Sequence, residues 1–431
     1  MRILHISTQD SDHGAARAAY RLHLGLRELG EDSSMLVAQR RSHDPNVREL
    51  VRSRRWSSRL PRLARRFAIQ RSFARYESSR PPEAQCFNND GRSEYGSAVV
   101  QQLPACDLVN LQAIPGLVDY RSFFRSVPRR IPVVWTLHDP SAFTGGCHYP
   151  APCVRFNHGC GACPELGSAD RNDLSRKIWR RKKESYSFVP GGRLHLVAPS
   201  RWLAGEVRQS ALLGGFPVSV IANGLDTSTF SPRDKGMARE ILAIKRDSNV
   251  VLFAADAVQD PRKGFKLLVE ALAPWPAGKH VDLVSVGRGS DFPGLQLPHK
   301  SLGHIENDRI LSWVYSAADV YVTPTLHDNL PCTVMESMAC ATPVVGFEVG
   351  GVPEMVRNGV SGFVVPKGDT GALRQAILRV LDNPALKAQM AENCRRIALE
   401  EYDVKLQARR YLTLYQSLVS PGQPSQEAGT A

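Results

Sequence analysis

Two carboxylates stand eight residues apart in a stretch whose residue types suit the binding of a phosphorylated sugar. Asp328 lies in a polar loop after a β-branched run, and Glu336 follows inside a segment with helical periodicity. Each carboxylate can accept two hydrogen bonds from the hydroxyls of a sugar or a ribose. The helix start between them offers backbone N–H groups to an anion. Two acids at this spacing are also typical of a solvated surface. The surrounding sequence therefore has to distinguish a ligand-binding site from such a surface.

A second candidate is Gly14, in the loop that follows the first β-branched run, Ile3–Ser7. The dinucleotide fingerprint with three spaced glycines is absent from this loop. Gly14 still lies at the expected start of a helix, where free N–H groups favour an anion. A turn glycine that lets the helix begin close to the sheet is the alternative reading.

The elements that must position these residues alternate between buried-type strands and amphipathic helices from end to end. This alternation predicts an α/β protein with parallel sheets covered by helices. Two successive series of strands, one ending near Ala222 and one beginning at Val250, predict two domains. We place them at 1–225 and 226–400, with a C-terminal helix at 401–419 and a disordered tail at 420–431 that is rich in Ser, Gly, Pro and Gln.

The stretch from Asp328 to Glu336, with Met338-Ala339-Cys340-Ala341-Thr342-Pro343 after it, resembles the retaining glycosyltransferases of family four. That family carries a Glu-x7-Glu motif before a similar turn. Here Asp328 replaces the first Glu, and Ala341 replaces a glycine. The resemblance extends to Asn223-Gly224-Leu225-Asp226 and to Gly350-Gly351-Val352-Pro353-Glu354. It covers the chain from Met1 to about Val419 and implies the GT-B fold, in which two Rossmann-like domains enclose a cleft and the helix 401–419 crosses back to the first domain.

The resemblance also implies roles for individual residues. Glu336 would bind the ribose of the donor, and Asp328 with the Asn329 and Leu330 backbone would bind the transferred sugar. Arg262 and Lys263 would neutralise the diphosphate, because a leaving group needs cations where its charge develops; a solvated basic turn is the alternative. The donor contacts would be completed by the backbone near Ile305 at the base, Gly14 at the diphosphate, and His138 beside the reacting sugar. No cofactor would be required.

Four cysteines lie in a segment that we delimit as an insertion at 145–165. Cys147, Cys153, Cys160 and Cys163 are spaced C-x5-C-x6-C-x2-C. Four thiolates satisfy tetrahedral zinc, so a structural zinc site is one interpretation. Reduced structural thiols and a disulfide pair are the others. The sequence Thr136-Leu137-His138-Asp139 followed by such a cluster is similar to a subgroup of these transferases associated with exopolysaccharides of the colanic-acid type.

Positive charge is concentrated in one segment. The chain carries 55 Lys and Arg against 42 Asp and Glu. Residues 51–75 hold nine arginines and no carboxylate, interleaved with Trp56, Phe67 and Phe73. This basic amphipathic pattern suits an anionic membrane surface. No nucleic-acid-binding signature accompanies it, so nucleic acid is not the expected partner. Pro61 predicts two short helices there rather than one.

Together these patterns predict a retaining hexosyltransferase. It would move a hexose from a nucleoside-diphosphate sugar to a hydroxyl acceptor, which is a lipid-linked or polysaccharide precursor. No stretch approaches about 18 uninterrupted apolar residues. We expect a cytoplasmic protein, peripheral at the inner membrane face. A GT-B sugar-nucleotide epimerase and a non-catalytic nucleotide-sugar binder are the alternatives.

Overall fold

The chain forms two compact units. The computed structural model describes residues 1–11, 14–51, 56–81, 84, 86–150, 152–273, 275–276, 278–289 and 297–420. The first unit comprises Met1–Pro199, Leu203–Ile221 and the chain from Gln407, and the second comprises Ser200–Trp202 and Ala222–Leu406. The chain thus passes between units at 221/222, four residues before the predicted boundary. The predicted tail lies, from residue 421 on, outside the described residues.

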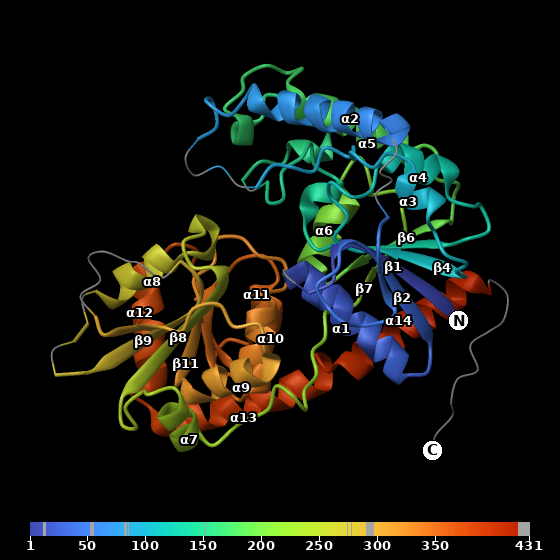
Figure 1. The fold of residues 1–431 in the computed structure, drawn as a ribbon. Helices are drawn as coiled ribbons and strands as arrows, with labels where there is room; N and C mark the ends of the chain where they lie inside the picture. Colours follow the sequence, from blue (N-terminus) through green and yellow to red (C-terminus); the bar gives the residue numbers. More distant parts are fainter. Residues whose placement is uncertain are drawn as a thin grey trace. The chain divides into compact units, whose positions relative to one another are not determined.

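In the described part of the first unit the strands form one sheet in the order β3-β2-β1-β4-β5-β6-β7, and every pair is parallel (Figure 1). Strands β4, β5 and β6 are almost wholly apolar and buried, as parallel strands covered on both faces must be. The strands are β1 Arg2–Gln9, β2 Asp32–Gln39, β3 Val47–Glu49, β4 Leu108–Leu111, β5 Val133–Thr136, β6 Leu194–Ala198 and β7 Val218–Val220.

Helices connect these strands. The first, α1, presents Ala19, Leu22 and Leu26 to the sheet at helical spacing. The helices are α1 Gly14–Glu28, α2 Trp56–Ala74, α3 Ala98–Gln101, α4 Tyr120–Ser126, α5 Leu174–Tyr186 and α6 Arg201–Gln209, with the short 3-10 turns η1 Pro140–Ala142, η2 Arg155–Asn157 and η3 Pro164–Leu166.

The second unit has its own parallel sheet, in the order β10-β9-β8-β11-β12-β13 over the described residues. Its strands are β8 Asn249–Ala257, β9 Val281–Arg288, β10 His299–Ser301, β11 Val320–Thr323, β12 Val344–Phe347 and β13 Gly362–Val365. Its helices are α7 Lys235–Ile241, α8 Phe265–Leu272, α9 Asp308–Ala317, α10 Cys332–Ala339, α11 Val352–Met355, α12 Thr370–Leu381 and α13 Pro384–Glu401, with the turn η4 Pro261–Lys263. The prediction of two parallel α/β domains is confirmed.

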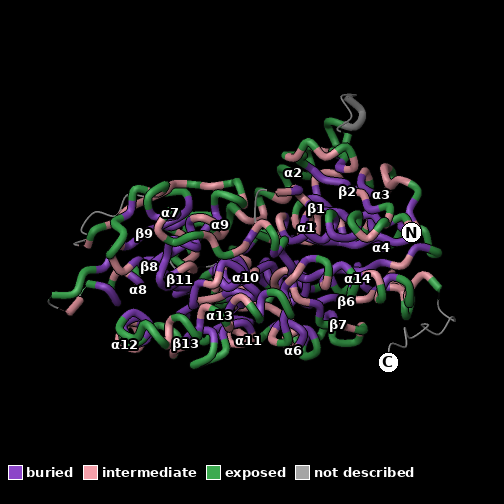
Figure 2. Tube along the Cα trace, turned by 90° about the horizontal axis from the view of Figure 1, so that it is seen from below, coloured by how far each residue is buried: buried purple, intermediate pink, exposed green. Residues whose placement is uncertain are grey.

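Each unit has a separate core, and the buried residues that form the cores are the purple stretches of the Cα trace in Figure 2. The C-terminal helix α14, Val404–Val419, packs from Gln407 onward on the sheet of the first unit. Tyr415 Oη accepts a hydrogen bond from Asn110 Nδ2 at 2.6 Å, and Tyr411 Oη lies 3.0 Å from Thr136 Oγ1. The last described helix therefore completes a core whose other buried members lie between Ile3 and Ile221.

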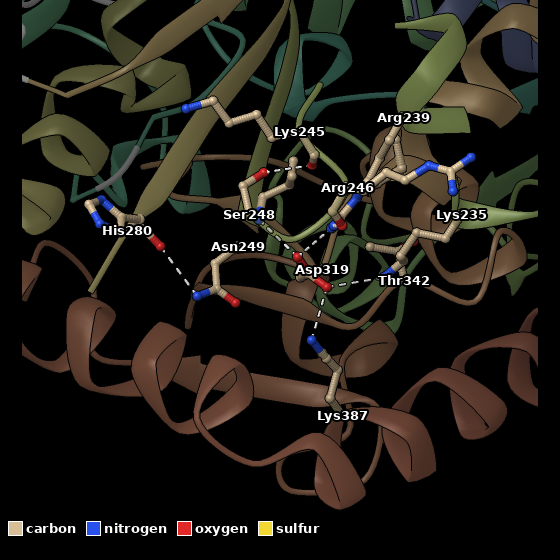
Figure 3. A network of polar contacts seen from close by, with 12 residues as sticks. Lys235, Arg239, Lys245, Arg246, Ser248, Asn249, His280, Asp319, Thr342 and Lys387 are labelled. Atoms are coloured by element: carbon tan, nitrogen blue, oxygen red, sulfur yellow. Dashed lines mark hydrogen bonds and ion pairs between the residues drawn. The ribbon is translucent and has the colours of Figure 1, made fainter. Parts of the chain in front are cut away.

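In the second unit a buried carboxylate ties helices to the sheet. Asp319, just before β11, accepts hydrogen bonds from Lys235 at 3.1 Å, Arg239 at 2.7 Å and Lys387 at 2.9 Å (Figure 3). Its Oδ2 also accepts from the backbone N–H of Val250 at 2.8 Å. Burial raises the pKa of Asp319, but the surrounding cations and this N–H outweigh it and lower the pKa to about 2. The network joins α7 and α13 to the starts of β8 and β11.

One prediction about the basic segment is wrong. Residues 56–74 form a single helix, α2, with Pro61 inside it. Pro61 is the sixth residue of α2, so its missing N–H removes one hydrogen bond of the second turn, and the helix continues past it. Phe73 is also not a surface aromatic, because it packs edge-on against Phe87 with ring centroids 6.1 Å apart. Arg52, Arg54 and Arg55 lie outside the described residues, as does the side chain of Trp56.

Candidate active site

A tight turn at the start of α8 carries the two predicted cations. Asp260 caps η4 by accepting from the N–H of Arg262, and Gly264 closes the turn with φ +73°. A Cβ at Gly264 would lie 1.9 Å from the carbonyl oxygen of Pro324, so only glycine fits. The carbonyl of Arg262 accepts from the N–H of Leu326 at 2.7 Å. The turn is therefore fixed against the loop that follows β11.

That loop brings Asp328 to both cations. Lys263 Nζ donates to Asp328 Oδ2 at 2.6 Å, and Arg262 lies 3.5 Å from the same oxygen. Arg262 also donates to the carbonyl of His327 at 2.9 Å. Burial raises the pKa of Asp328, but the charges of Lys263 and Arg262 outweigh burial and hold it below the usual value. Arg262 Nη2 also lies 3.2 Å from Asp260 Oδ2, so the two cations of this cluster face two carboxylates.

His327, beside this cluster, was not among the predicted site residues. Its ring lies 3.1 Å from Lys367 Nζ. Burial, together with the charges of Lys367 and Arg262, lowers the pKa of His327 to about 4, so the ring is neutral at pH 7. Its position directly before Asp328 was the only signal in the sequence.

Asn329 and Leu330 follow Asp328 and are buried. Their backbone is held by the paired glycines that the sequence analysis singled out. A Cβ at Gly350 would lie 1.7 Å from the carbonyl oxygen of Asp328, and the N–H of Gly351 donates to the carbonyl of Asn329 at 2.8 Å. This close approach of two backbones fixes the loop that carries Asp328.

Glu336 lies in α10, which begins after Pro331 as N-cap. The side chain is buried, and Glu336 Oε2 accepts a hydrogen bond from Tyr315 Oη at 3.0 Å. Tyr315, on α9, was not predicted as a site residue, because nothing in its local sequence links it to a carboxylate 21 positions away. Ile305 is half-buried against the core of the second unit, and no described contact joins it to Asp328 or Glu336.

In the first unit, His138 follows β5 and lines a cavity of about 260 Å³. Thr8, Gln112 and Leu137 also line it. These residues lie at the carboxyl ends of β1, β4 and β5, the edge where ligands bind in open parallel sheets. His138 Nε2 lies 2.9 Å from Gln112 Oε1. Burial lowers the pKa of His138 to about 4, so its ring is neutral at pH 7 and Nε2 donates to Gln112.

Gly14 begins α1 and is exposed, and a Cβ there would meet no atom within 4 Å. Packing therefore does not require glycine at this position. The next residues, Ala15 and Ala16, line the same cavity as His138. The structure thus brings the start of α1 and His138 to one edge of the first sheet, and it groups Arg262, Lys263 and Asp328 in the second unit.

An ion pair missed by the sequence analysis lies in the wall of this cavity. His148 Nδ1 lies 2.8 Å from Asp139 Oδ2, and its Nε2 lies 2.7 Å from Asn88 Oδ1. Burial lowers the pKa of His148, but Asp139 outweighs burial and raises it to about 10. Burial likewise raises the pKa of Asp139, but His148 and the Ser141 hydrogen bonds lower it to about 2. The residue next to His138 is thus held by a charged histidine from the cysteine-rich segment.

The four cysteines of that segment line one small cavity of about 10 Å³. All four are free thiols. Burial raises the pKa of Cys160 to about 12 and that of Cys163 to about 11, which keeps these thiols neutral. Four sulfurs suit zinc chemically. As they stand, however, the described side chains include no group of three or more His, Cys, Asp or Glu that could hold a metal ion.

Comparison with known proteins finds a match to a family model over part of the chain. Residues 248–383 match the family model described as "Glycosyl transferases group 1". The chain is 31% identical over 193 residues to D-inositol 3-phosphate glycosyltransferase 2 of Catenulispora acidiphila, covering 41% of this chain and 45% of the relative. It is 30% identical over 222 residues to the phosphatidyl-myo-inositol mannosyltransferase of Mycobacterium leprae, covering 48% and 56%. The chain therefore spans about half the length of these curated relatives.

The likeness to solved structures extends over the whole fold. HepE of Anabaena, solved in complex with UDP, matches with a TM-score of 0.65 and 18% identity, covering 97% of this chain and 100% of HepE. At this identity the likeness concerns the fold alone. The chain has the GT-B fold of two Rossmann-like units.

Proposed function

We propose that the chain is a glycosyltransferase that moves a hexose from a nucleoside-diphosphate sugar to a hydroxyl acceptor, with retention at the anomeric carbon. The observation that carries this proposal is the cluster of Arg262, Lys263 and Asp328 before α10. It lies inside the segment that matches the glycosyl transferases of group 1. Two basic side chains beside a buried acid suit a ligand that carries both phosphates and hydroxyls.

In this proposal each residue acts on a stated part of the donor. As the bond from the anomeric carbon to the phosphate oxygen breaks, negative charge grows on the diphosphate, and Arg262 and Lys263 stabilise it. Asp328 accepts hydrogen bonds from the transferred sugar, together with the backbone of Asn329 and Leu330. Glu336 accepts hydrogen bonds from the ribose. The acceptor oxygen bonds to the anomeric carbon and its proton passes to the leaving phosphate.

The remaining implied roles belong to the same proposal. Ile305 would contact the base, and Gly14 and His138 would contact the diphosphate and the sugar. The cavity beside His138 is our proposed acceptor site, because polar groups from Gln112, Asn89 and Ser141 line it. A relative named for phosphatidyl-myo-inositol supports an acceptor carried on a lipid, and hence work at the inner membrane face. The link to exopolysaccharides of the colanic-acid type rests on the sequence motif.

Structural zinc at Cys147, Cys153, Cys160 and Cys163 stays a proposal too. Its support is the cavity that the four thiols share. Because they form no metal-holding group as they stand, binding has to draw the sulfurs together. Zinc would stabilise the segment that carries His148, and no step of the reaction depends on it.

Three measurements test the proposed activity. A thermal-shift screen of UDP-, GDP- and ADP-sugars should show one base that stabilises the protein, since a ligand at about 100 times its dissociation constant adds about 2.7 kcal/mol. The chosen donor should then release nucleoside diphosphate slowly without acceptor, and NMR of the transfer product should show a retained anomer. Thermal stabilisation by a donor without any release of nucleoside diphosphate would indicate a non-catalytic binder. A product with inverted anomeric configuration would contradict retention.

A further inference from the structure

The helix α2 exposes three large apolar side chains on one face. Leu60 is 59% exposed, Leu63 43% and Phe67 64%. Their spacing of three and four residues places them together along one side of the helix. Exposed apolar side chains that gather on one face mark an interaction surface, whereas isolated ones carry no such meaning.

The opposite face of α2 holds the helix to the first unit. Phe73 packs on Phe87, in the cluster that includes Leu174 and Ile178 of α5. Arg65 Nε donates to the carbonyl of Glu94 at 3.2 Å, and Ile69 lines a cavity with Ala38 of the first sheet. At 3.6 residues per turn, residues 65, 69 and 73 point about 150° away from residues 60, 63 and 67. Figure 1 shows α2 along the outside of the first unit, next to α5.

Arginines border the apolar face on both sides. By the same helical geometry, Arg59 and Arg66 lie about 70–90° to one side of its centre and Arg71 about 50° to the other. All three are exposed. Residues 51–75 contain nine arginines and no carboxylate, so the segment itself is strongly basic. An apolar strip with guanidinium groups on both sides complements a surface with anionic headgroups outside and acyl chains beneath.

We propose that this outer face, made of Leu60, Leu63, Phe67, Arg59, Arg66 and Arg71, binds the surface of a bilayer that contains anionic lipid. Nucleic acid would use the arginines, but Leu60 and Leu63 cannot stack on bases and would gain nothing from it. The inference does not depend on the reaction proposed above. Within the described ranges no helix combines the length and apolar character needed to cross a bilayer.

Vesicle sedimentation tests the proposal with two triple variants. The wild type should bind phosphatidylcholine vesicles with about a third phosphatidylglycerol, lose most binding without the anionic lipid, and weaken as salt rises past about 0.1 M. Leu60→Ser/Leu63→Ser/Phe67→Ser should lower the partition coefficient at least about tenfold at any salt. Arg59→Gln/Arg66→Gln/Arg71→Gln should lower it by a similar factor at low salt and abolish the salt dependence.

The chain offers matched controls. Ile241, Ile310 and Leu399 are 60%, 48% and 45% exposed in the second unit, and their change to Ser should leave vesicle binding unchanged. Arg396, Arg409 and Arg410, exposed on α13 and α14, serve in the same way when changed to Gln. Melting temperature and donor binding, measured on every variant, show that the fold is intact.

Two results would overturn the proposal. One is sedimentation of both α2 variants with anionic vesicles as strongly as the wild type. The other is binding to single-stranded RNA that depends on the arginines and not on Leu60, Leu63 and Phe67, with no binding to vesicles, which would make the face a nucleic-acid surface. Loss of vesicle binding with donor release intact supports the proposal and leaves the proposed reaction untouched.

Discussion

Lys263→Ala should weaken binding of the nucleoside diphosphate, and the structure sets the size of the effect. A hydrogen bond to a charged group contributes about 1.5–3 kcal/mol. Lys263 Nζ lies 2.6 Å from Asp328 Oδ2, so a diphosphate must share or displace that contact. We therefore expect a loss near the lower end, about 1.5–2 kcal/mol, or about 10- to 30-fold in Kd. Calorimetric titration of the diphosphate that the screen identifies measures it.

The competition itself can be measured by a double-mutant cycle. Asp328→Asn removes the carboxylate that holds Lys263, so diphosphate affinity should stay equal or rise while turnover falls. In the Asp328→Asn background, Lys263→Ala should lower diphosphate affinity more than it does in the wild type, with a coupling energy of about 1 kcal/mol. Lys266→Ala, an exposed lysine on α8, is the matched control and should change nothing. Equal affinity of wild type and Lys263→Ala would refute the phosphate site, and zero coupling would refute the competition.

Three further predictions concern other parts of the molecule. Glu336→Ala should lower kcat/KM by a factor equivalent to about 2–4 kcal/mol of transition-state stabilisation. Tyr315→Phe removes only the supporting hydroxyl and should lower kcat/KM less. Equal losses in the two variants would contradict a direct role for Glu336. The pKa of His148 is raised from 6.5 to about 10, so its ion pair stabilises the folded protein fully below about pH 6.5. This contribution is lost as pH rises toward 10. The melting temperature should therefore fall over that range, and it should fall less in His148→Gln. The pKa of Asp139 is lowered from 3.8 to about 2, so its stabilisation is lost as pH falls through that interval. Metal analysis of the reduced protein should find about one zinc per chain, and Cys160→Ser should lose it. A wild-type protein without zinc would contradict the metal site and leave reduced thiols or a disulfide pair as the interpretation.

Strand periodicity predicted most of the fold, and its failures have a physical cause. Runs such as Leu194–Ala198 are apolar enough to be recognised as buried parallel strands. The edge strands β3 and β10 were missed, because Val47-Arg48-Glu49 contains one apolar residue and His299-Lys300-Ser301 contains none. Pro61 was read as a break, because local sequence does not show how close it lies to the helix start.

The site residues could be named from motifs, but their partners could not. Lys263 and Asp328 are 65 positions apart, and only the packing of the η4 turn on the loop after β11 brings them together. His148 could have been suspected from its place beside Cys147, since a histidine in a cysteine cluster draws attention as a ligand. Its actual partner, Asp139, depends on how the segment folds back over β5.

The return of α14 to the first sheet has a consequence for the order in which the two units fold during synthesis. When Ile221 leaves the ribosome, the sheet of the first unit is complete, but Asn110 and Thr136 still lack Tyr415 and Tyr411. At a synthesis rate of about 5–20 residues per second, Tyr411 and Tyr415 follow about 10–40 s later. The long segment of the second unit, Ala222–Leu406, is made within that interval. The half of the protein that is translated first therefore finishes folding last, with an apolar surface awaiting its final helix.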